Sequence, residues 1–275
     1  MKNNRFGKFV RSAVLIALTV ILLFPFFWLL RSSFMTTREI FSVPMKWFPE
    51  KIRFENYLKA FNSAPFGRYF LNTFFVVGLN VIGTIFSSSF VAFGFARLKF
   101  KGRNFWFALM ISTMMIPYTV LMIPQFIGWK YAGAYNTYFP LILPAFFGNP
   151  FFIFLTRQFY LGIPKELDEA ALADGASYLK IYRSVILPLS KPVLCSVGVF
   201  TFMWNWNDFM GPLIYLKDAD KRTVSLGLQT FIGQYTSDWN LLMAAATVIT
   251  IPMIIVFFLA QRYFIEGITF TGIKG

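Results

Sequence analysis

The sequence contains no histidine and only one cysteine, Cys195, in 275 residues. Without imidazole side chains, histidine metal sites, histidine-based catalysis and histidine proton relays are excluded. A single cysteine cannot form a disulfide within the chain. The pattern G-x-x-x-x-G-K-[ST], whose backbone amides cradle the phosphates of ATP, is also missing. Any chemistry on ATP must therefore be done by another chain.

Charged residues are scarce as well. They make up 14% of the chain, whereas a soluble domain carries roughly a quarter. Hydrophobic residues supply 57%, phenylalanine alone contributes 37 side chains, and the mean hydropathy is +0.59. This composition predicts an integral membrane protein. The net charge of +14 fits that class, because Lys and Arg hold cytoplasmic ends and meet anionic lipid head groups. We expect no nucleic-acid binding, since no fold surrounds a basic stretch to present it to a duplex.

The apolar runs predict an all-α membrane protein with six transmembrane helices, because about 20 apolar residues cross the hydrocarbon core as a helix. The six runs are Ala13–Leu30, Phe70–Gly94, Phe105–Ile127, Tyr138–Leu155, Val193–Leu216 and Leu241–Phe264. The fourth run is the weakest, because prolines and a glycine interrupt it and proline removes a backbone hydrogen bond from a helix. The interrupting residues are Pro140, Pro144, Gly148 and Pro150. Breaks of this kind are tolerated at membrane depth only against protein or a watery cavity.

Basic residues in short loops set the expected orientation. Four of them crowd the connection between the second and third runs, whereas the next connection holds only Lys130. The four are Arg97, Lys99, Lys101 and Arg103. The positive-inside rule then places this connection, both termini and the segment 157–192 in the cytoplasm.

The domain organisation follows from this topology. Residues 1–12 are expected to be a cytoplasmic N-terminus, because the apolar run that follows is long for a signal core and lacks a small-x-small cleavage site. The transmembrane domain is expected over 13–264, with its core at about 70–264 and a cytoplasmic tail over 265–275.

The segment 157–192 predicts two short helices that lie at the membrane surface. In the first helix, Pro164 suits the first position, where its missing N–H costs nothing. Three acids follow in the first turns, where the positive end of the helix dipole favours negative charge. They are Glu166, Asp168 and Glu169. One face is mostly small or apolar and consists of Ile163, Leu167, Ala170, Ala171 and Asp174.

A glycine and a serine separate the two helices. Gly175 provides a stop, because glycine adopts the left-handed cap conformation cheaply, and Ser177 can cap the second helix. The second helix is amphipathic, with apolar positions at helical spacing. They are Tyr178, Ile181, Tyr182, Val185 and Ile186. From these residues alone, the hairpin either seats its small-residue face in a groove of a partner or is an ordinary surface hairpin with acids placed for capping.

The same loop resembles the cytoplasmic motif of bacterial ABC importer permeases, E-A-A-x-x-x-G followed at a set distance by a hydrophobic residue and then x-L-P. In this chain the motif residues are Glu169, Ala170, Ala171, Gly175, Val185, Leu187 and Pro188. The family usually has Ile where Val185 stands. The whole chain further resembles the shorter permease subunit of maltose-type carbohydrate importers, through the stretch Arg222–Phe231 and the ending from Gln261 to Gly275. This resemblance implies a type I ABC importer permease fold.

In such permeases the loop 157–192 is the coupling loop, whose first helix seats in a cleft on the ATPase subunit. The resemblance implies that Glu169 offers a carboxylate to a basic group there. It also implies that Ala170 and Ala171 permit close approach and that Gly175 sets the turn. The remaining residues of the implied coupling site are Asp174, Leu187 and Pro188.

The resemblance also implies an assembly in the bacterial inner membrane. Its other members are a second permease, two ATPase subunits that bind ATP and Mg, an extracytoplasmic solute-binding protein and the carbohydrate that this protein delivers. The present chain is then not an enzyme and holds no cofactor or metal of its own. Its outer loop Lys217–Asn240 resembles the loop that contacts the binding protein.

Polar side chains within the predicted spans are the candidates to meet the solute, because amides and carboxylates at membrane depth normally face the bundle or a watery cavity. In the fifth run they are Trp204, Asn205, Trp206, Asn207 and Asp208, and indoles beside amides suit sugars. Alternatively, the two indoles form an interfacial belt and Asp208 ends the helix. In the second run Asn72 and Asn80 share an inward face, where hydrogen bonding between helices is the alternative role.

An ion-gradient-driven secondary transporter is the alternative from a different class of protein. Acids within the membrane would support it, but Asp208 is the only clear candidate within a predicted span. A membrane-embedded enzyme would need a paired acid and base or a metal constellation, and the sequence offers neither.

Overall fold

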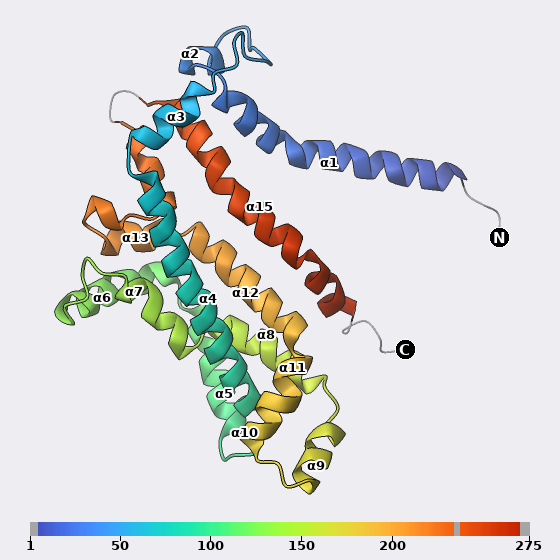
Figure 1. The fold of residues 1–275 in the computed structure, drawn as a ribbon. Coiled ribbons are helices and arrows are strands. Elements are labelled where there is room, and N and C mark those ends of the chain that lie inside the picture. Colours follow the sequence, from blue (N-terminus) through green and yellow to red (C-terminus); the bar gives the residue numbers. More distant parts are fainter. Residues whose placement is uncertain (1–4, 234–236, 270–275) are drawn as a thin grey trace. The chain divides into compact units, whose positions relative to one another are not determined.

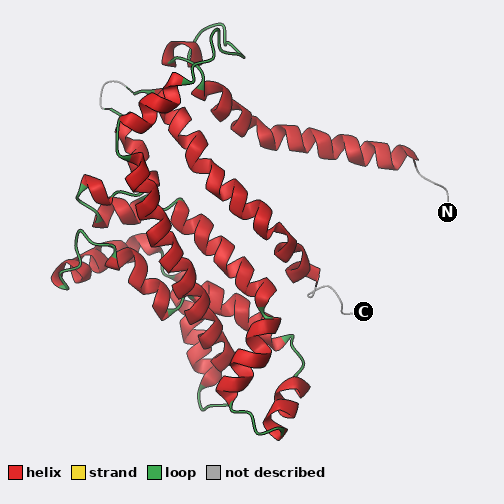
Figure 2. Cartoon of the chain, viewed as in Figure 1, coloured by secondary structure: helices red, strands yellow, loops and turns green. Residues whose placement is uncertain are grey.

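The computed structural model describes residues 5–233 and 237–269, and the regular structure of these residues is helical apart from one isolated bridge between Ile232 and Ser237 (Figure 2). The chain packs as two units. The first unit joins Met1–Phe66 to Gly227–Ile251, and the second joins Gly67–Leu226 to Pro252–Gly275. The expected tail over 265–275 has only its first residues, as far as 269, within the described part of the chain.

The first unit combines a long apolar helix with several short helices (Figure 1). Its elements are α1 (Arg5–Ser33), α2 (Thr37–Ile40), α3 (Glu55–Asn62), η5 (Leu228–Phe231) and the first part of α15 (Trp239–Thr269). The buried Asn56 amide donates to the backbone oxygens of Ser33 and Met35 at 2.8 Å each, and the Asn56 side-chain oxygen accepts from Asn240 at 3.1 Å. One side chain therefore fastens three segments that are distant in sequence.

The second unit carries most of the helices. The longer ones are α4 (Phe66–Arg97), α5 (Arg103–Ser112), α6 (Tyr118–Tyr131), α8 (Pro150–Leu161), α9 (Glu166–Ala173) and α12 (Lys191–Trp206). The shorter ones are α7 (Phe139–Ile142), α10 (Tyr178–Ile181), α11 (Leu187–Leu189), α13 (Met210–Tyr215) and α14 (Val224–Gly227). Single turns join them at η1 (Thr113–Met115), η2 (Leu143–Phe147), the π-helical η3 (Tyr182–Ile186) and η4 (Ala219–Lys221).

The apolar helices agree with the fold class predicted from the sequence. Among the described residues, four helical segments are long and apolar enough to cross a membrane, and two bent helix pairs raise the number to six if each pair is one span. The four segments are Gly7–Ser33, Phe66–Arg97, Phe139–Leu161 and Trp239–Gln261. They contain or overlap the first, second, fourth and sixth predicted runs, so an all-helical protein with up to six spans is confirmed.

The third predicted run, Phe105–Ile127, is not a single helix. A bend of 97° separates Arg103–Met115 from Tyr118–Tyr131. Ile116 between them has extended backbone angles, φ −83° and ψ 116°. The residue before a proline avoids the helical region because the proline ring clashes with it, and Pro117 follows directly.

The fifth predicted run, Val193–Leu216, is wrong as one continuous helix. Helix α12 ends at Trp206, and a short break separates it from α13. Pro212 has no N–H to bond the carbonyl one turn earlier, so a helix cannot continue through it without losing a bond. Instead the Asp208 Oδ1 accepts the N–H of Gly211 at 3.1 Å and starts a new helix. The amides and the carboxylate of this run thus lie around a break.

The fourth run is interrupted as its prolines predict. A 3₁₀ turn ends at Gly148, whose φ is +96°. Asn149 then caps α8, because its side-chain oxygen accepts the N–H groups of Phe151 at 3.0 Å and Phe152 at 3.4 Å. Pro150 occupies the first helical position, where its missing donor is harmless.

A buried cluster joins α4 and α8 to the second helix of the loop. Its members are Ala92, Phe93, Ala96, Ile153, Tyr160, Ile181, Tyr182 and Ile186. Three of the five amphipathic positions predicted for that helix are therefore buried, and Val185 packs against the cluster. Tyr178, at the start of the helix, is exposed.

Candidate functional site

Helix α9 is the most exposed helix of the loop 157–192, and none of its residues, all of which the structure describes, is buried. It begins at Glu166, two residues after Pro164, because Lys165 takes the cap position. Glu169 and Ala170 are exposed, whereas Ala171 is half-buried against the cluster under the loop. The helix therefore presents Glu169 and Ala170 to its surroundings, together with the exposed Leu167 and Leu172, while Ala171 faces the domain.

The turn after α9 has the geometry that its sequence predicts. Gly175 has a φ of +75°, the left-handed region that favours glycine, and its N–H donates to the Leu172 carbonyl at 3.0 Å. Ser177 then caps α10 by accepting the N–H of Lys180 at 3.3 Å. Local signals thus define both ends of the turn.

The two halves of the E-A-A…G…L-P pattern lie in different places. Glu169 to Gly175 form the exposed helix and its turn, with Asp174 exposed at the end. Leu187 packs against the buried cluster, and Pro188 lies in α11, beside the 76° bend into α12. The second half of the pattern therefore shapes the entry into a membrane helix.

An ion pair between Arg97 and Asp168 is the feature of this loop that the sequence did not reveal. The Nη1 of Arg97, at the end of α4, lies 3.3 Å from the Oδ2 of Asp168, and the side chains are 3% and 15% exposed. The Nη2 of Arg97 also donates to the Ile163 carbonyl at 2.9 Å. Burial raises the pKa of the Asp168 carboxyl; the positive charge of Arg97 opposes this rise and the negative charge of Glu169 adds to it.

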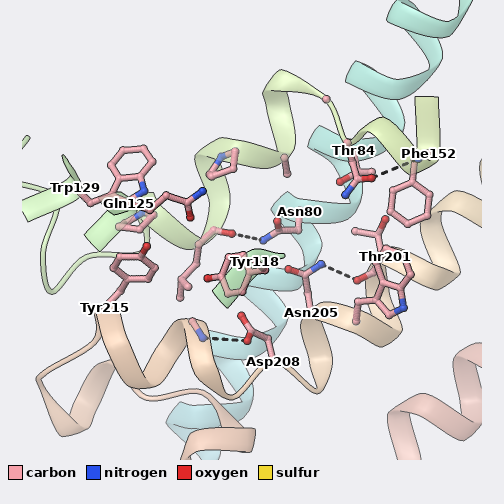
Figure 3. A pocket seen from close by; sticks show the side chains of 18 of the residues that line it. Asn80, Thr84, Tyr118, Gln125, Trp129, Phe152, Thr201, Asn205, Asp208 and Tyr215 are labelled. Atoms are coloured by element: carbon pink, nitrogen blue, oxygen red, sulfur yellow. Dashed lines mark hydrogen bonds between the residues drawn. The ribbon is translucent and has the colours of Figure 1, made fainter. Parts of the chain in front are cut away.

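A second feature is a cavity of about 780 Å³ within the second unit (Figure 3). Segments from α4, α6, the broken fourth run, α12 and α13 surround it. Its polar lining includes Asn80, Thr84, Tyr118, Gln125, Asn205 and Asp208. Its aromatic lining includes Trp129, Phe152, Trp204 and Tyr215. A cavity of this size and composition offers both hydrogen bonds and flat apolar surfaces.

Hydrogen bonds hold the polar groups of the cavity in place. The Asn205 amide nitrogen donates to Thr201 O at 2.8 Å, which leaves its oxygen to face the cavity. The Asn80 amide nitrogen donates to Leu141 O at 2.9 Å and so ties α4 to the broken fourth run. Asp208 accepts from Gly211, as described above. Preset groups of this kind bind a ligand without having to be ordered first.

The structure brings together four of the seven residues predicted to meet a solute. Asn80, Trp204, Asn205 and Asp208 line the cavity. The other three lie elsewhere. Trp206 is 1% exposed and packs on Phe74, with ring centroids 5.0 Å apart. Asn207 is exposed and donates to Met203 O. Asn72 donates to Asp220 O at 2.7 Å and to Arg222 O at 2.9 Å, which holds the loop around η4 on α4.

Tyr118, Gln125 and Thr84 were missed as cavity residues. Each is a polar side chain within a predicted apolar run, and that property is the signal that could have found them. Among the residues that the structure describes, no group of three or more His, Cys, Asp or Glu side chains is placed to hold a metal ion.

Comparisons with known proteins give consistent matches. Residues 85–269 match the family described as binding-protein-dependent transport system inner membrane component. The chain is 36% identical over 257 residues to the probable ABC transporter permease protein YurM of Bacillus subtilis, covering 92% of this chain and 84% of the relative. It is 34% identical over 258 residues to the arabinooligosaccharides transport system permease protein AraQ of Halalkalibacterium halodurans, covering 93% and 92%.

Two further matches extend over almost the whole chain. The chain is 32% identical over 278 residues to the diacetylchitobiose uptake system permease protein DasC of Streptomyces coelicolor, covering 100% of both. Its fold is similar to a chain in the crystal structure of a bacterial ABC transporter involved in the import of the acidic polysaccharide alginate. The TM-score is 0.81 at 23% identity, over 96% of this chain and 98% of the other.

Proposed function

We propose that this chain forms one half of the membrane pathway of an ATP-driven carbohydrate importer, because it belongs to the family of binding-protein-dependent transport system inner membrane components. Its relatives are named for arabinooligosaccharides, diacetylchitobiose and, at 33% identity, melibiose, raffinose and stachyose. Small oligosaccharides are the class that these names share. A solute-binding protein delivers the carbohydrate, and a second permease completes the pathway.

The observation that carries this proposal is the exposed helix α9 with Glu169 and Ala170 on its surface and left-handed Gly175 at its end. A surface helix with small side chains can enter a groove of a partner closely. In the proposal that partner is an ATPase subunit, which binds ATP and Mg, so this chain hydrolyses nothing itself. Glu169 offers its carboxylate to a basic group of the ATPase. Closure of the ATPases then moves α9 as a rigid element.

In this proposal the loop 157–192 and both termini face the cytoplasm of a bacterial cell, and the cavity is part of the path that the solute takes. The indole of Trp204, which is exposed and packs on the buried ring of Phe152 with centroids 5.0 Å apart, supplies apolar surface for the flat face of a sugar ring. Asn205, Asp208 and Tyr118 supply hydrogen-bond partners for hydroxyl groups. An apolar surface beside several hydrogen-bonding groups suits an uncharged polyhydroxy solute.

The experiment is uptake by the purified complex in proteoliposomes, with this chain, the second permease, the ATPase and the binding protein that the proposal requires. We expect vanadate-sensitive, ATP-dependent uptake of a labelled oligosaccharide. Glu169→Lys should abolish uptake while the two permeases still insert and assemble, because the reversed charge repels the basic group of the ATPase. Glu169→Asp, which keeps the carboxylate, is the matched control and should retain uptake.

Two outcomes would overturn the proposal. Uptake that needs no ATPase and follows an imposed proton or sodium gradient would favour a secondary transporter. Full uptake by Glu169→Lys would show that α9 does not make the contact with the ATPase subunit.

A further inference from the structure

The ion pair of Arg97 and Asp168, whose side chains are 3% and 15% exposed, joins the exposed helix α9 to the end of α4. Its two side chains are nearly sealed from solvent, yet Arg97 Nε and Asp168 Oδ1 have no hydrogen-bond partner among the described residues. Two buried charges lose their hydration, and an incompletely bonded pair does not regain all of that loss. The pair therefore contributes little to the stability of the fold.

The position of the pair indicates another use. None of the residues of α9, all described, is buried; half-buried Ala171 packs against the buried cluster, whereas Leu167 and Leu172 are exposed. Arg97 contacts the first turn of α9 through Asp168. It also donates to the Ile163 carbonyl at 2.9 Å, in the segment that precedes the helix. One guanidinium thus fixes the helix and its entry to the same point on α4.

Helix α4 leads from this point to the cavity. It is continuous from Phe66 to Arg97, and both Asn80 and Thr84 on it line the cavity. Arg97 lies about 25 Å along the helix from Asn80, at 1.5 Å per residue. Asn80 also donates to Leu141 O at 2.9 Å, so a displacement of α4 reaches the broken fourth run as well. A continuous helix transmits a displacement of its end with little loss.

We propose that the Arg97–Asp168 pair is the joint through which α9 moves α4 and thereby reshapes the cavity. The inference rests on the proposed function, since it takes α9 to be the element that the ATPase displaces. Arg97 and Asp168 are positioning residues, and neither touches the solute or the nucleotide. Without the joint, α9 can follow the ATPase while α4 stays behind, so ATP is consumed without movement of the solute.

The decisive variant replaces both charges by apolar side chains of similar size, Arg97→Met with Asp168→Leu. Because it leaves no unpaired buried charge, we expect a thermal unfolding temperature of the purified complex no lower than that of the wild type. ATP hydrolysis should persist in proteoliposomes, but uptake per ATP hydrolysed should fall by at least about tenfold, the scale of a typical coupling energy between sites. Stimulation of hydrolysis by the loaded binding protein should also be lost.

Two further variants separate position from charge. The exchange Arg97→Asp with Asp168→Arg restores opposite charges, and we expect it to recover more of the uptake per ATP than either single change. Asp168→Asn and Glu166→Gln each remove one negative charge from the first turn of α9, but Glu166 is exposed. Asp168→Asn should uncouple, and Glu166→Gln should not.

Normal uptake per ATP in the apolar double variant would overturn the inference, as would equal effects of Asp168→Asn and Glu166→Gln. These results are distinct from failure of the proposed function. In that case the wild-type complex itself would show no ATP-dependent uptake, whatever the state of the pair.

Discussion

The hydroxyl groups of buried Ser89 and of Tyr182, a member of the buried cluster beneath the loop, lie 2.8 Å apart. Ser89 belongs to α4, and Tyr182 begins the π-helical turn of the loop's second helix. Ser89 Oγ also donates to Phe86 O at 3.0 Å, so the Tyr182 hydroxyl is the donor between the two side chains. The second helix is thus fastened to α4 by a hydrogen bond as well as by apolar packing. Widened turns of this kind are frequent where a helix serves a function.

Removal of the Tyr182 hydroxyl tests this attachment. Tyr182→Phe keeps the ring contacts with Phe90 and Phe93 but loses one buried hydrogen bond. We expect a loss of about 1 kcal/mol in the free energy of unfolding, and about 3–5 kcal/mol for Tyr182→Ala, which also leaves a cavity. Chemical unfolding of the detergent-solubilised protein, followed by far-UV circular dichroism, measures both.

Tyr178→Phe provides the control for the Tyr182 variants, because Tyr178 is exposed in the preceding turn of the same helix. It should leave the free energy of unfolding within about 0.5 kcal/mol of the wild type. Equal losses for the two phenylalanine variants would show that the buried hydrogen bond contributes nothing.

A series at Gly175 tests the turn that follows α9. A Cβ there meets open space, so the penalty for a side chain comes only from the φ of +75°. Asn tolerates that region, Ala costs about 1–2 kcal/mol, and Pro cannot adopt it and also removes the N–H that bonds to Leu172 O. We expect uptake per ATP to fall in the order Gly, Asn, Ala, Pro, while membrane insertion stays intact. Normal coupling in Gly175→Pro would contradict a role for this turn.

The loop shows how far local signals reach. The capping serine Ser177, the left-handed Gly175 and the buried spacing of Ile181, Tyr182 and Ile186 were all predictable, because each depends on its immediate neighbours in sequence. The Arg97–Asp168 pair was not predictable. Each residue has a sufficient local explanation, a basic end of a short loop for Arg97 and the dipole of a helix for Asp168, and nothing local indicates that the two meet.

The breaks in the helices were predictable only in part. Pro117 and Pro212 lie within runs of high hydropathy, and hydropathy registers neither the clash of a proline ring with the preceding residue nor the missing backbone donor. The fourth run was recognised as interrupted because its prolines are concentrated there. The cavity lies where these breaks converge: Tyr118 follows Pro117, Asn149 precedes Pro150 and Asp208 precedes α13. That separate breaks meet at one cavity depends on how the helices pack, and this packing cannot be predicted from the local signals of a single sequence.

The pH dependence of the first unit should follow Glu39, which is 9% exposed. Burial favours the neutral acid, but hydrogen bonds from Thr36 and the Glu50 N–H favour the carboxylate, and the net effect lowers the pKa of Glu39. A lowered pKa in the folded state stabilises the fold above the ordinary value near 4.3, and this stabilisation is lost as pH falls through the folded pKa.

We therefore expect the unfolding temperature of the wild type to drop below about pH 4 more steeply than that of Glu39→Gln, which has no proton to bind there. Glu39→Ala should cost about 1 kcal/mol at pH 7, because it also removes one half of the capping box with Thr36. Thermal unfolding of the three proteins between pH 3 and 7 measures these effects. Parallel curves for the wild type and Glu39→Gln would show that another acid dominates.

Gly211 controls the position of the Asp208 carboxylate in the cavity. A Cβ on Gly211 would overlap the Asp208 Oδ2 and would approach the Leu141 Cδ2 to 2.9 Å. In Gly211→Ala the carboxylate must move, and the bond from the Gly211 N–H that starts α13 is strained. Because a bound sugar depends on the placement of such groups, we expect the KM for the delivered oligosaccharide to rise by about tenfold, a loss of about 1.4 kcal/mol.

Gly78→Ala is the matched control for Gly211→Ala. Gly78 lies within α4, and a Cβ there meets no atom within 4 Å. Ala is the better helix former by about 0.5–1 kcal/mol, so this variant should be as stable as the wild type or slightly more stable, with unchanged uptake. If Gly211→Ala also takes up its oligosaccharide with an unchanged KM, the solute does not contact Asp208. Displacement of a carboxylate that contacts the solute would change the affinity for the solute. An unchanged KM would therefore favour the alternative, in which Asp208 only starts a helix.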